Sequence, residues 1–434
     1  MKALIKYLAL LNIVICFGQI DNVERRANIN MTSEFANPGI LISEIVKGSP
    51  EDKSGLANND LIISVNGKTI QNSKEFNKVR RSLRGNTKTK LILKRNGKII
   101  KKEVEFDALP LETHSGLDIE YGSFVTDYGY AVRTLTTKPA KNTAKTLPAI
   151  YFVQWLSCSP VESRGNSNGF SNLIWNLSKA GYMLYRTEKA GTGDSNGPDC
   201  SELDFTTEYN IHKQSIKSFL NRDDIDKDHV YIMGGSMGSN IAAMLANDFP
   251  EFKALIFSGG YHKPWQERLF DFERRTMEYK GLPEEEIYNR TKLFSEFYND
   301  YFYNEMTPGE IIKAKPKMAT IWTGSTDLQY GRPVEFYVQA NNVNMAKVWK
   351  DVKQPILALY GEYDWIMDFE DNLKIIKQAS NSKSKLVLLN NTDHSLYLYD
   401  ENLKKNEAFN NQSSKPNIKV ADKIVKWLKK IKNK

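Results

Sequence analysis

Apolar residues follow two different rhythms along this chain. Over residues 27–107 they alternate with polar residues in short runs, and turn signals such as Asn66-Gly67 separate the runs. This alternation is typical of strands with one buried face. Further on, continuous apolar runs such as Leu147–Val153 alternate with longer helical segments such as Phe205–Leu220. Strands that alternate with helices predict a mostly parallel sheet, so we expect a small β-rich domain followed by an α/β domain.

Two interruptions of these rhythms set the predicted boundaries. Residues 108–122, with Pro110 and Gly116, are typical of a linker, so the α/β domain is expected to span 123–434. Within that domain the alternation breaks over 261–350, which are helical and rich in aromatic residues. An aromatic stripe at helical spacing is core more often than ligand contact. We interpret 261–350 as a helical cap, with some of its rings lining a pocket.

The first 18 residues have the pattern of a secretory signal. Lys2 and Lys6 give a basic start, and Leu8–Phe17 is an apolar stretch of the length of a signal-peptide core. The stretch is short for a helix that spans a membrane. We expect cleavage after 1–18 and an exported protein, periplasmic or secreted, with no stable membrane insertion afterwards. An uncleaved anchor is the alternative.

Composition narrows the function classes. The chain has 434 residues, 41% of them hydrophobic and 26% charged, which indicates a globular protein with a full-sized core. Its net charge is +8, but aromatic residues do not interleave with the basic ones. A basic, solvated surface is therefore favoured over nucleic-acid binding.

One five-residue stretch, Gly234–Gly238, has a pattern that is typical of a catalytic nucleophile. It has the pattern G-x-S-x-G and lies between the apolar run His229–Met233 and a helical segment rich in small residues. Strand, G-x-S-x-G and helix are the context of a nucleophile elbow, in which a sharp turn exposes the serine hydroxyl. Ser236 is the predicted nucleophile. The alternative is an ordinary glycine-rich turn with a helix-capping serine.

The succession of elements around Ser236 resembles the α/β-hydrolase superfamily, including its esterase and serine aminopeptidase-like members. The motifs that carry the resemblance are the elbow, the loop Gly191–Gly197 (G-x-G-D-S-x-G), the stretch Gly361–Asp364 (G-x-x-D) and the pair Asp393-His394. The loop Gly191–Gly197 is also similar to a dinucleotide-binding fingerprint. We reject that interpretation because no strand–helix junction follows the loop directly. The resemblance implies a mostly parallel sheet with a helical cap.

The family order of serine, acid and histidine identifies the partners of Ser236. Of the five histidines, three precede the serine and His262 comes before any acid loop, so His394 is the predicted base. Asp364 matches the family's acid, with Glu362 and Asp368 as alternatives. Asp393 adjoins His394 and is poorly placed to reach its ring. His394 would take the proton of Ser236, and Asp364 would orient the imidazole.

The resemblance also implies an oxyanion hole of two backbone N–H donors. One is the residue after the nucleophile, Met237. The other belongs to the loop after Leu147–Val153, where many esterases have H-G-G-G and this chain has Gln154-Trp155-Leu156-Ser157. Trp155 is the predicted second donor, with Leu156 next.

Two cysteines remain after the signal segment, Cys158 and Cys200. An even pair in an exported protein favours a disulfide, and both cysteines follow loops at the carboxyl ends of neighbouring predicted strands. A bridge there would brace the oxyanion loop. Two free buried thiols are the alternative.

The β-rich domain at 27–107 resembles a PDZ domain of the bacterial protease-associated type. The matching motifs are Gly48-Ser49-Pro50, Ser54-Gly55-Leu56, Asp60-Leu61-Ile62 and Val65-Asn66-Gly67. PDZ domains bind peptide C-termini by strand addition, which makes a peptide C-terminus an expected partner. The loop that would hold the carboxylate, Arg26–Asn30, lacks the usual glycine, so a purely structural or autoregulatory role is equally open.

Together these features predict an exported serine hydrolase that cleaves a carboxylic ester, an amide or a short peptide through an acyl-enzyme on Ser236. An esterase or broad acyl hydrolase is slightly favoured. A serine aminopeptidase fed by the PDZ-like domain, an acyl transferase and a non-catalytic PDZ scaffold are the alternatives. No pattern of metal ligands or of an organic cofactor is present in the sequence.

Overall fold

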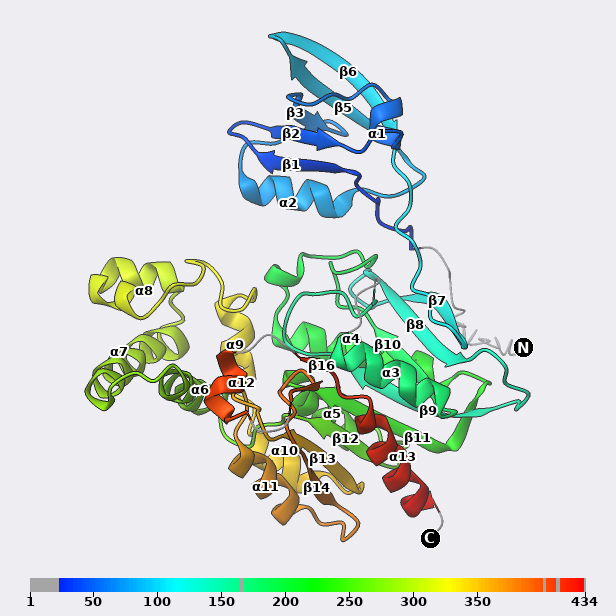
Figure 1. The fold of residues 1–434 in the computed structure, drawn as a ribbon, viewed down its shortest axis with the longest axis vertical. Coiled ribbons are helices and arrows are strands. Elements are labelled where there is room, and N and C mark those ends of the chain that lie inside the picture. The colour runs from blue at the N-terminus through cyan, green and yellow to red at the C-terminus, as the bar shows by residue number, and fades with distance from the viewer. Residues whose placement is uncertain (1–22, 164–167, 401–402, 411–413, 433–434) are drawn as a thin grey trace, which may run out of the picture.

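The computed structural model describes residues 23–163, 168–400, 403–410 and 414–432. The expected signal segment, 1–18, lies outside them. The described residues form two domains, each with its own sheet (Figure 1). The predicted α/β class, with a β-rich domain ahead of it, is confirmed.

The small domain is an antiparallel six-stranded sheet packed on a helix. Its strands lie in the order β1-β2-β3-β5-β6, with β4 beside β3, so β1 is an edge. Ile42 and Leu93 of the sheet pack with Val79 of the longer helix in one core. The elements are β1 Met31–Phe35, β2 Ile40–Ile45, α1 Pro50–Lys53, β3 Leu61–Val65, β4 Lys68–Thr69, α2 Ser73–Ser82, β5 Lys88–Arg95 and β6 Lys98–Glu105.

The large domain is built on an eight-stranded sheet in the order β14-β13-β12-β11-β9-β10-β8-β7. The strands from β14 to β10 are parallel, and the hairpin β7–β8 is antiparallel at one edge. The strands are β7 Leu117–Val125, β8 Ala131–Pro139, β9 Leu147–Val153, β10 Met183–Thr187, β11 Ile225–Gly235, β12 Leu255–Ser258, β13 Ile356–Gly361 and β14 Lys385–Leu389.

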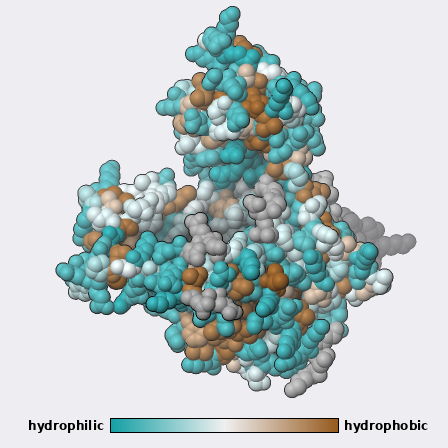
Figure 2. Space-filling model, viewed as in Figure 1, coloured by the Kyte–Doolittle hydropathy of each residue, from teal (hydrophilic) through white to brown (hydrophobic). Residues whose placement is uncertain are grey.

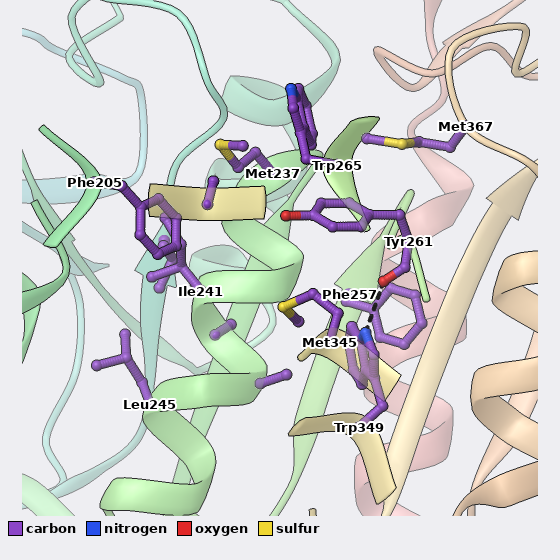
Figure 3. Packing of buried hydrophobic residues seen from close by; sticks show 14 of the residues in the cluster. Phe205, Met237, Ile241, Leu245, Phe257, Tyr261, Trp265, Met345, Trp349 and Met367 are labelled. Carbon is purple, nitrogen blue, oxygen red and sulfur yellow. Dashed lines mark hydrogen bonds between the residues drawn. The ribbon is translucent and has the colours of Figure 1, made fainter. Parts of the chain in front are cut away.

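Helices cover both faces of this sheet. Successive residues of β11 point to opposite faces, so Ile232 joins one apolar core and Tyr231 the other. Figure 3 shows the first core, in which side chains of α4, α5 and α10 pack together and Trp349 Nε1 donates to the Tyr261 carbonyl (2.9 Å). The helices on that face are α4 Phe205–Leu220, α5 Met237–Asp248, α10 Met345–Asp351 and α11 Phe369–Gln378; those on the other are α3 Gly169–Lys179 and α13 Lys419–Lys432.

A helical insertion separates β12 from β13, as the broken rhythm of the sequence predicts (Figure 1). The last helix before β13, α10, packs on α5 and therefore belongs to the sheet layer, although the expected cap reached residue 350. No helix of the described ranges is both long and apolar enough to cross a membrane. The remaining elements are α6 Trp265–Tyr279, α7 Glu284–Tyr303, α8 Pro308–Ala314, α9 Val334–Asn341, α12 Lys405–Asn410, β15 Tyr397–Leu398, β16 Lys415–Pro416 and the 3-10 helices Cys200–Glu202 and Pro316–Thr320.

The segment between the domains is more ordered than its composition suggests. We expected a linker over 108–122, but β7 begins at Leu117. Ahead of it Glu112 is buried and accepts hydrogen bonds from Arg186 (2.9 Å), Trp175 (2.9 Å) and the Ser163 N–H (2.8 Å). Arg186 is fully buried, so the linker supplies the carboxylate that neutralises a cation of β10.

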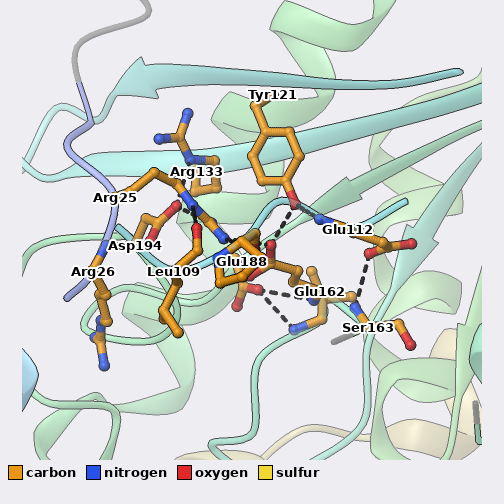
Figure 4. Close-up of polar contacts among 12 residues, drawn as sticks. Arg25, Arg26, Leu109, Glu112, Tyr121, Arg133, Glu162, Ser163, Glu188 and Asp194 are labelled. Atoms are coloured by element: carbon orange, nitrogen blue, oxygen red, sulfur yellow. Dashed lines mark hydrogen bonds and ion pairs between the residues drawn. The ribbon is translucent and has the colours of Figure 1, made fainter. Parts of the chain in front are cut away.

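The chain ahead of the small domain also docks on the large one. Arg25 forms ion pairs with Glu162 (2.8 Å) and Asp194, and the Arg26 N–H donates to Asp194 (3.0 Å), as Figure 4 shows for this cluster. Asp194 lies in the G-x-G-D-S-x-G loop. That loop therefore anchors the N-terminal segment.

A second, weaker contact joins the domains at their surfaces. Lys74 and Lys78 of α2 lie 3.4 and 3.7 Å from Glu202, and Arg81 lies 3.5 Å from Asp199. The two lysine pairs are solvent-exposed, and such pairs are worth roughly 0.2–1 kcal/mol each. In the view of Figure 2, the surface of both domains is largely hydrophilic.

Replacing Glu112 with alanine is expected to destabilise the large domain by about 3–5 kcal/mol, because it leaves Arg186 buried without its counter-charge. Scanning calorimetry measures the change. Glu105→Ala, an exposed glutamate of β6, is the control and should shift the melting transition little. Equal shifts for both variants would contradict the role given to Glu112.

Candidate active site

Ser236 occupies the turn between β11 and α5 in a conformation that few residues adopt. Its φ is 56° and its ψ is −130°, a combination that is strained for a side chain other than glycine. The Ser236 N–H donates to the Ser258 carbonyl of β12 (2.8 Å), and the Ser239 hydroxyl donates to the same carbonyl (3.0 Å). These bonds tie the turn to the neighbouring strand and hold the strained residue in place.

The glycines around Ser236 are required by close packing. A Cβ on Gly238 would lie 2.3 Å from the Gln154 carbonyl oxygen, and one on Gly235 would lie 2.6 Å from the ring of Phe170. Both distances are far below van der Waals contact. The N-terminus of α5 therefore approaches the loop after β9 closely, which only a residue without a side chain allows.

His394 and Asp364 meet at the carboxyl ends of the strands. His394 Nδ1 lies 2.8 Å from Asp364 Oδ2. The His394 ring also borders Gly259, where a Cβ would come within 2.9 Å of it, and Gly259 follows the Ser258 that holds the turn of Ser236. Loops that are distant in sequence thus bring the predicted acid and base to the elbow.

Asp364 is held as an ionised acceptor. It is buried, which opposes ionisation, but His394 and the backbone N–H groups of Met367 (2.9 Å) and Ile366 (2.8 Å) lower its pKa. The two alternative acids have other partners. Glu362 accepts from the Asn391 N–H (2.8 Å), and Asp368 caps α11.

Asp393, adjacent to His394, braces the loop. Its carboxylate accepts hydrogen bonds from the backbone N–H groups of Ser395 (2.9 Å) and Tyr397 (2.8 Å) and from the Tyr399 hydroxyl (3.2 Å). It therefore shapes the turn that carries His394, whose Nδ1 is bonded to Asp364.

Ser236 and His394 line one pocket of about 430 Å3. The direct hydrogen bond between the Ser236 hydroxyl and His394 is not formed; such bonds often tighten only when substrate binds. The pocket wall is mostly apolar and aromatic. Its described members are Trp155, Leu156, Ser157, Asn168, Phe170, Ser236, Trp265, Arg268, Phe272, Tyr330, Ile366, Met367, His394, Ser395 and Tyr397.

The loop after β9 is held in place by hydrogen bonds that its carbonyl groups accept from two buried cations. Lys189 Nζ donates to the Trp155 carbonyl (2.7 Å), and Arg332 Nε donates to the Leu156 carbonyl (3.1 Å). The backbone N–H groups of Trp155 and Met237 have no acceptor within the described chain. Both predicted oxyanion donors are therefore available, and the close approach at Gly238 brings their segments together.

A buried carboxylate, Glu208 of α4, holds the two cations. It pairs with Lys189 (2.7 Å) and with Arg332. Burial opposes its charge, yet Arg332 and Lys189 lower the pKa of Glu208 to about 2. Burial lowers the pKa of Lys189 to about 8. We refer to Lys189, Glu208 and Arg332 as the loop anchor.

The predicted disulfide between Cys158 and Cys200 is present, with a Cα–Cα distance of 5.7 Å. Arg332 of the loop anchor also donates to the Cys200 carbonyl (3.0 Å). The bridge therefore joins the loop after β9 to the segment 199–202 that faces α2 of the small domain.

The sequence patterns did not identify the loop anchor or Arg268. Lys189 carried a usable signal, because a charged residue that closely follows a buried strand needs a partner. Arg332 and Arg268 lie in the insertion, where no periodicity indicates which side chains face the sheet. In the described ranges, no cluster of three His, Cys, Asp or Glu side chains could hold a metal ion.

The small domain has a shallow apolar depression between β1 and α2, lined by residues such as Met31, Phe76 and Val79. The backbone N–H groups of the loop ahead of β1 are largely engaged. Asn28 donates to the Asp107 carbonyl (2.7 Å) and Asn30 to Glu51 (2.7 Å). In this conformation, few N–H groups of that loop are free to bind a peptide carboxylate.

Comparison with known proteins places both domains. Residues 164–401, more than half of the chain, match the family described as the alpha/beta hydrolase fold, and residues 21–106 match the PDZ domain family. A probable periplasmic serine endoprotease, DegP-like, from Chlamydia pneumoniae is 34% identical over 103 residues, which are 24% of this chain and 20% of that protein. The chain thus spans about a fifth of the length of that relative.

Solved structures with a similar fold have low sequence identity. Est1E from Butyrivibrio proteoclasticus with bound ferulic acid is 16% identical, with 71% of this chain and 99% of that chain covered and a TM-score of 0.46. A hypothetical protein from Pseudomonas aeruginosa is 13% identical. The match covers 74% of this chain and 95% of that chain, with a TM-score of 0.48. On the family matches, this chain belongs to the α/β-hydrolase fold family and carries a PDZ domain at its N-terminal side.

Proposed function

We propose that the large domain is a serine hydrolase that cleaves a carboxylic ester or amide through an acyl-enzyme on Ser236. The observation that carries the proposal is the convergence of three features. A strained serine at a strand–helix turn and a histidine line one pocket, and the histidine is bonded to a buried aspartate. A helix-capping serine requires neither the strain nor the histidine.

In the first step, the Ser236 oxygen would attack the carbonyl carbon of the substrate while His394 takes the hydroxyl proton. Asp364 would fix the imidazole so that Nδ1 carries a proton and Nε2 faces the serine, and it would stabilise the imidazolium that forms. His394 then gives the proton to the leaving alcohol or amine. In the second step, water attacks the acyl-enzyme by the same route and releases the acid.

The developing oxyanion would accept hydrogen bonds from the N–H groups of Met237 and Trp155. This assignment is supported by the loop anchor, which binds the carbonyl side of the Trp155 loop and leaves the N–H side unoccupied. Pre-positioned donors of this kind are worth about 3 kcal/mol each in the transition state.

A largely apolar pocket of about 430 Å3 favours an ester or acyl substrate of modest size over a long polypeptide. A serine aminopeptidase fed by the PDZ domain is the second possibility, and an acyl transferase uses the same acyl-enzyme. A non-catalytic scaffold is disfavoured, because such a protein would have no need for Ser236, Asp364 and His394 to converge at one pocket.

We further infer that the protein is exported. The Cys158–Cys200 disulfide fits an oxidising compartment, and the relatives of the PDZ part are named periplasmic. A screen of p-nitrophenyl esters beside aminoacyl-p-nitroanilides separates esterase from peptidase activity, with Ser236→Ala as the blank.

A fluorophosphonate probe should label Ser236 in the folded protein, because the probe reacts with activated serines. Ser236→Ala should abolish labelling and lower kcat by at least about 10³-fold. Ser382→Ala, at an exposed loop position, is the control and should label like the parent protein. Absence of labelling at Ser236 in folded protein would contradict the serine mechanism.

Asp364→Asn is expected to lower kcat by about 10⁴-fold with the fold retained, because an amide no longer holds the imidazole in the required tautomer. Steady-state kinetics and circular dichroism test this together. The exposed neighbour Glu370→Gln is the matched control. Full activity of Asp364→Asn would contradict this assignment and would mean that another residue orients the histidine.

Reduction of the Cys158–Cys200 bridge is expected to lower activity roughly tenfold before the protein unfolds, because small displacements of positioned groups are costly in rate. A dithiothreitol titration, followed by activity and by circular dichroism, measures both. The double variant Cys158→Ser/Cys200→Ser should be insensitive to the reductant. Simultaneous loss of activity and fold would count against this role of the bridge.

A further inference from the structure

One cation in the wall of the pocket forms no ion pair with a carboxylate among the described residues. Arg268 of α6 lines the same pocket as Ser236 and His394, and it is 5% exposed. Among the lining residues that the structure describes, it is the one with a permanent charge. The proposed mechanism gives it no task.

The contacts of Arg268 leave much of its guanidinium unpaired. Nη2 donates to the Ile366 carbonyl (2.9 Å), while Nε is buried without an acceptor. The group lies over the rings of Trp265 (4.8 Å) and Phe272 (5.0 Å). Aromatic faces stabilise a cation, but they accept none of its N–H bonds in the way a carboxylate does.

Other buried arginines of this protein are treated differently. Arg186 pairs with Glu112 and Arg332 with Glu208, each with its carboxylate in the core. Within the described residues, Arg268 has no such ion pair. The two acids whose charge reaches it are engaged elsewhere: Asp364 binds His394, and Glu273 accepts from the Tyr298 hydroxyl (2.9 Å).

A buried guanidinium without a carboxylate is costly unless a ligand supplies one. We propose that Arg268 binds a carboxylate of the substrate, so that the preferred substrate is an ester or amide that carries a free carboxylate beyond the scissile bond. This inference rests on the serine hydrolase function for the location of the scissile bond. A single cation in a mostly apolar wall suits a monoanion, whereas a phosphate dianion usually meets several donors.

The test compares two esters of equal acyl length, mono-p-nitrophenyl glutarate and p-nitrophenyl valerate, which differ in a terminal carboxylate. The parent protein is expected to have the higher kcat/KM for the glutarate. Arg268→Gln is expected to lower the ratio of the two kcat/KM values at least tenfold, and Arg268→Lys to retain part of it.

The control is Arg274→Gln on the same helix, which removes the same charge from an exposed side chain paired with Glu278. It should leave the ratio unchanged. Melting curves of each variant report folding, but a merely structural role of Arg268 would affect both esters alike and would not move the ratio.

A binding measurement separates this inference from the mechanism. We would titrate monomethyl glutarate into the Ser236→Ala variant and into the double variant Ser236→Ala/Arg268→Gln. Calorimetry then measures binding without turnover. At least tenfold weaker binding with Arg268→Gln supports the carboxylate site even if the fluorophosphonate fails to label Ser236. Equal binding, or an unchanged ester ratio with Ser236 labelled, overturns the role of Arg268 and leaves the serine mechanism standing.

Discussion

The strained backbone of Ser236 is the constraint on which the rest of the site depends. A φ of 56° at a serine persists only where its surroundings fix it, and here the Ser258 carbonyl, the closeness of Gly238 to Gln154 and the ring of Phe170 beside Gly235 do so. The same close packing brings the loop after β9 to the N-terminus of α5. The position of the serine and the position of the loop after β9 are therefore consequences of one steric arrangement.

Buried ion pairs fix the positions of further loops at a greater distance from the elbow. Glu208 holds Lys189 and Arg332, which bind the carbonyls of the loop after β9, and Glu112 neutralises Arg186 from the segment between the domains. Each carboxylate comes from a different part of the chain than the cation it meets. Buried pairs of this kind add little net stability but penalise any arrangement that separates them, so they specify one loop geometry. Arg268 is the exception that points to a ligand.

The sequence predicted elements with strong periodicity well. The strand Leu147–Val153 and the helix Phe205–Leu220 agree residue for residue, because each has a clear apolar pattern bounded by turn signals. The assignments of His394 and Asp364 rest on the resemblance to the α/β-hydrolase family together with the scarcity of histidines, and the disulfide, which the structure contains, was predicted from an even pair of cysteines. The loop anchor, the buried Glu112 and Arg268 could not be predicted, since their partners lie 19 to 124 residues away and local patterns carry no record of them.

The most direct test of the central claim is rapid-quench mass spectrometry of the protein mixed with p-nitrophenyl acetate. The account predicts one acetyl group per chain, on the peptide that carries Ser236, formed in step with a burst of p-nitrophenol and absent from Ser236→Ala. Ester turnover without an acylated intermediate, or an acetyl group on another residue that turns over at the same rate, would contradict it.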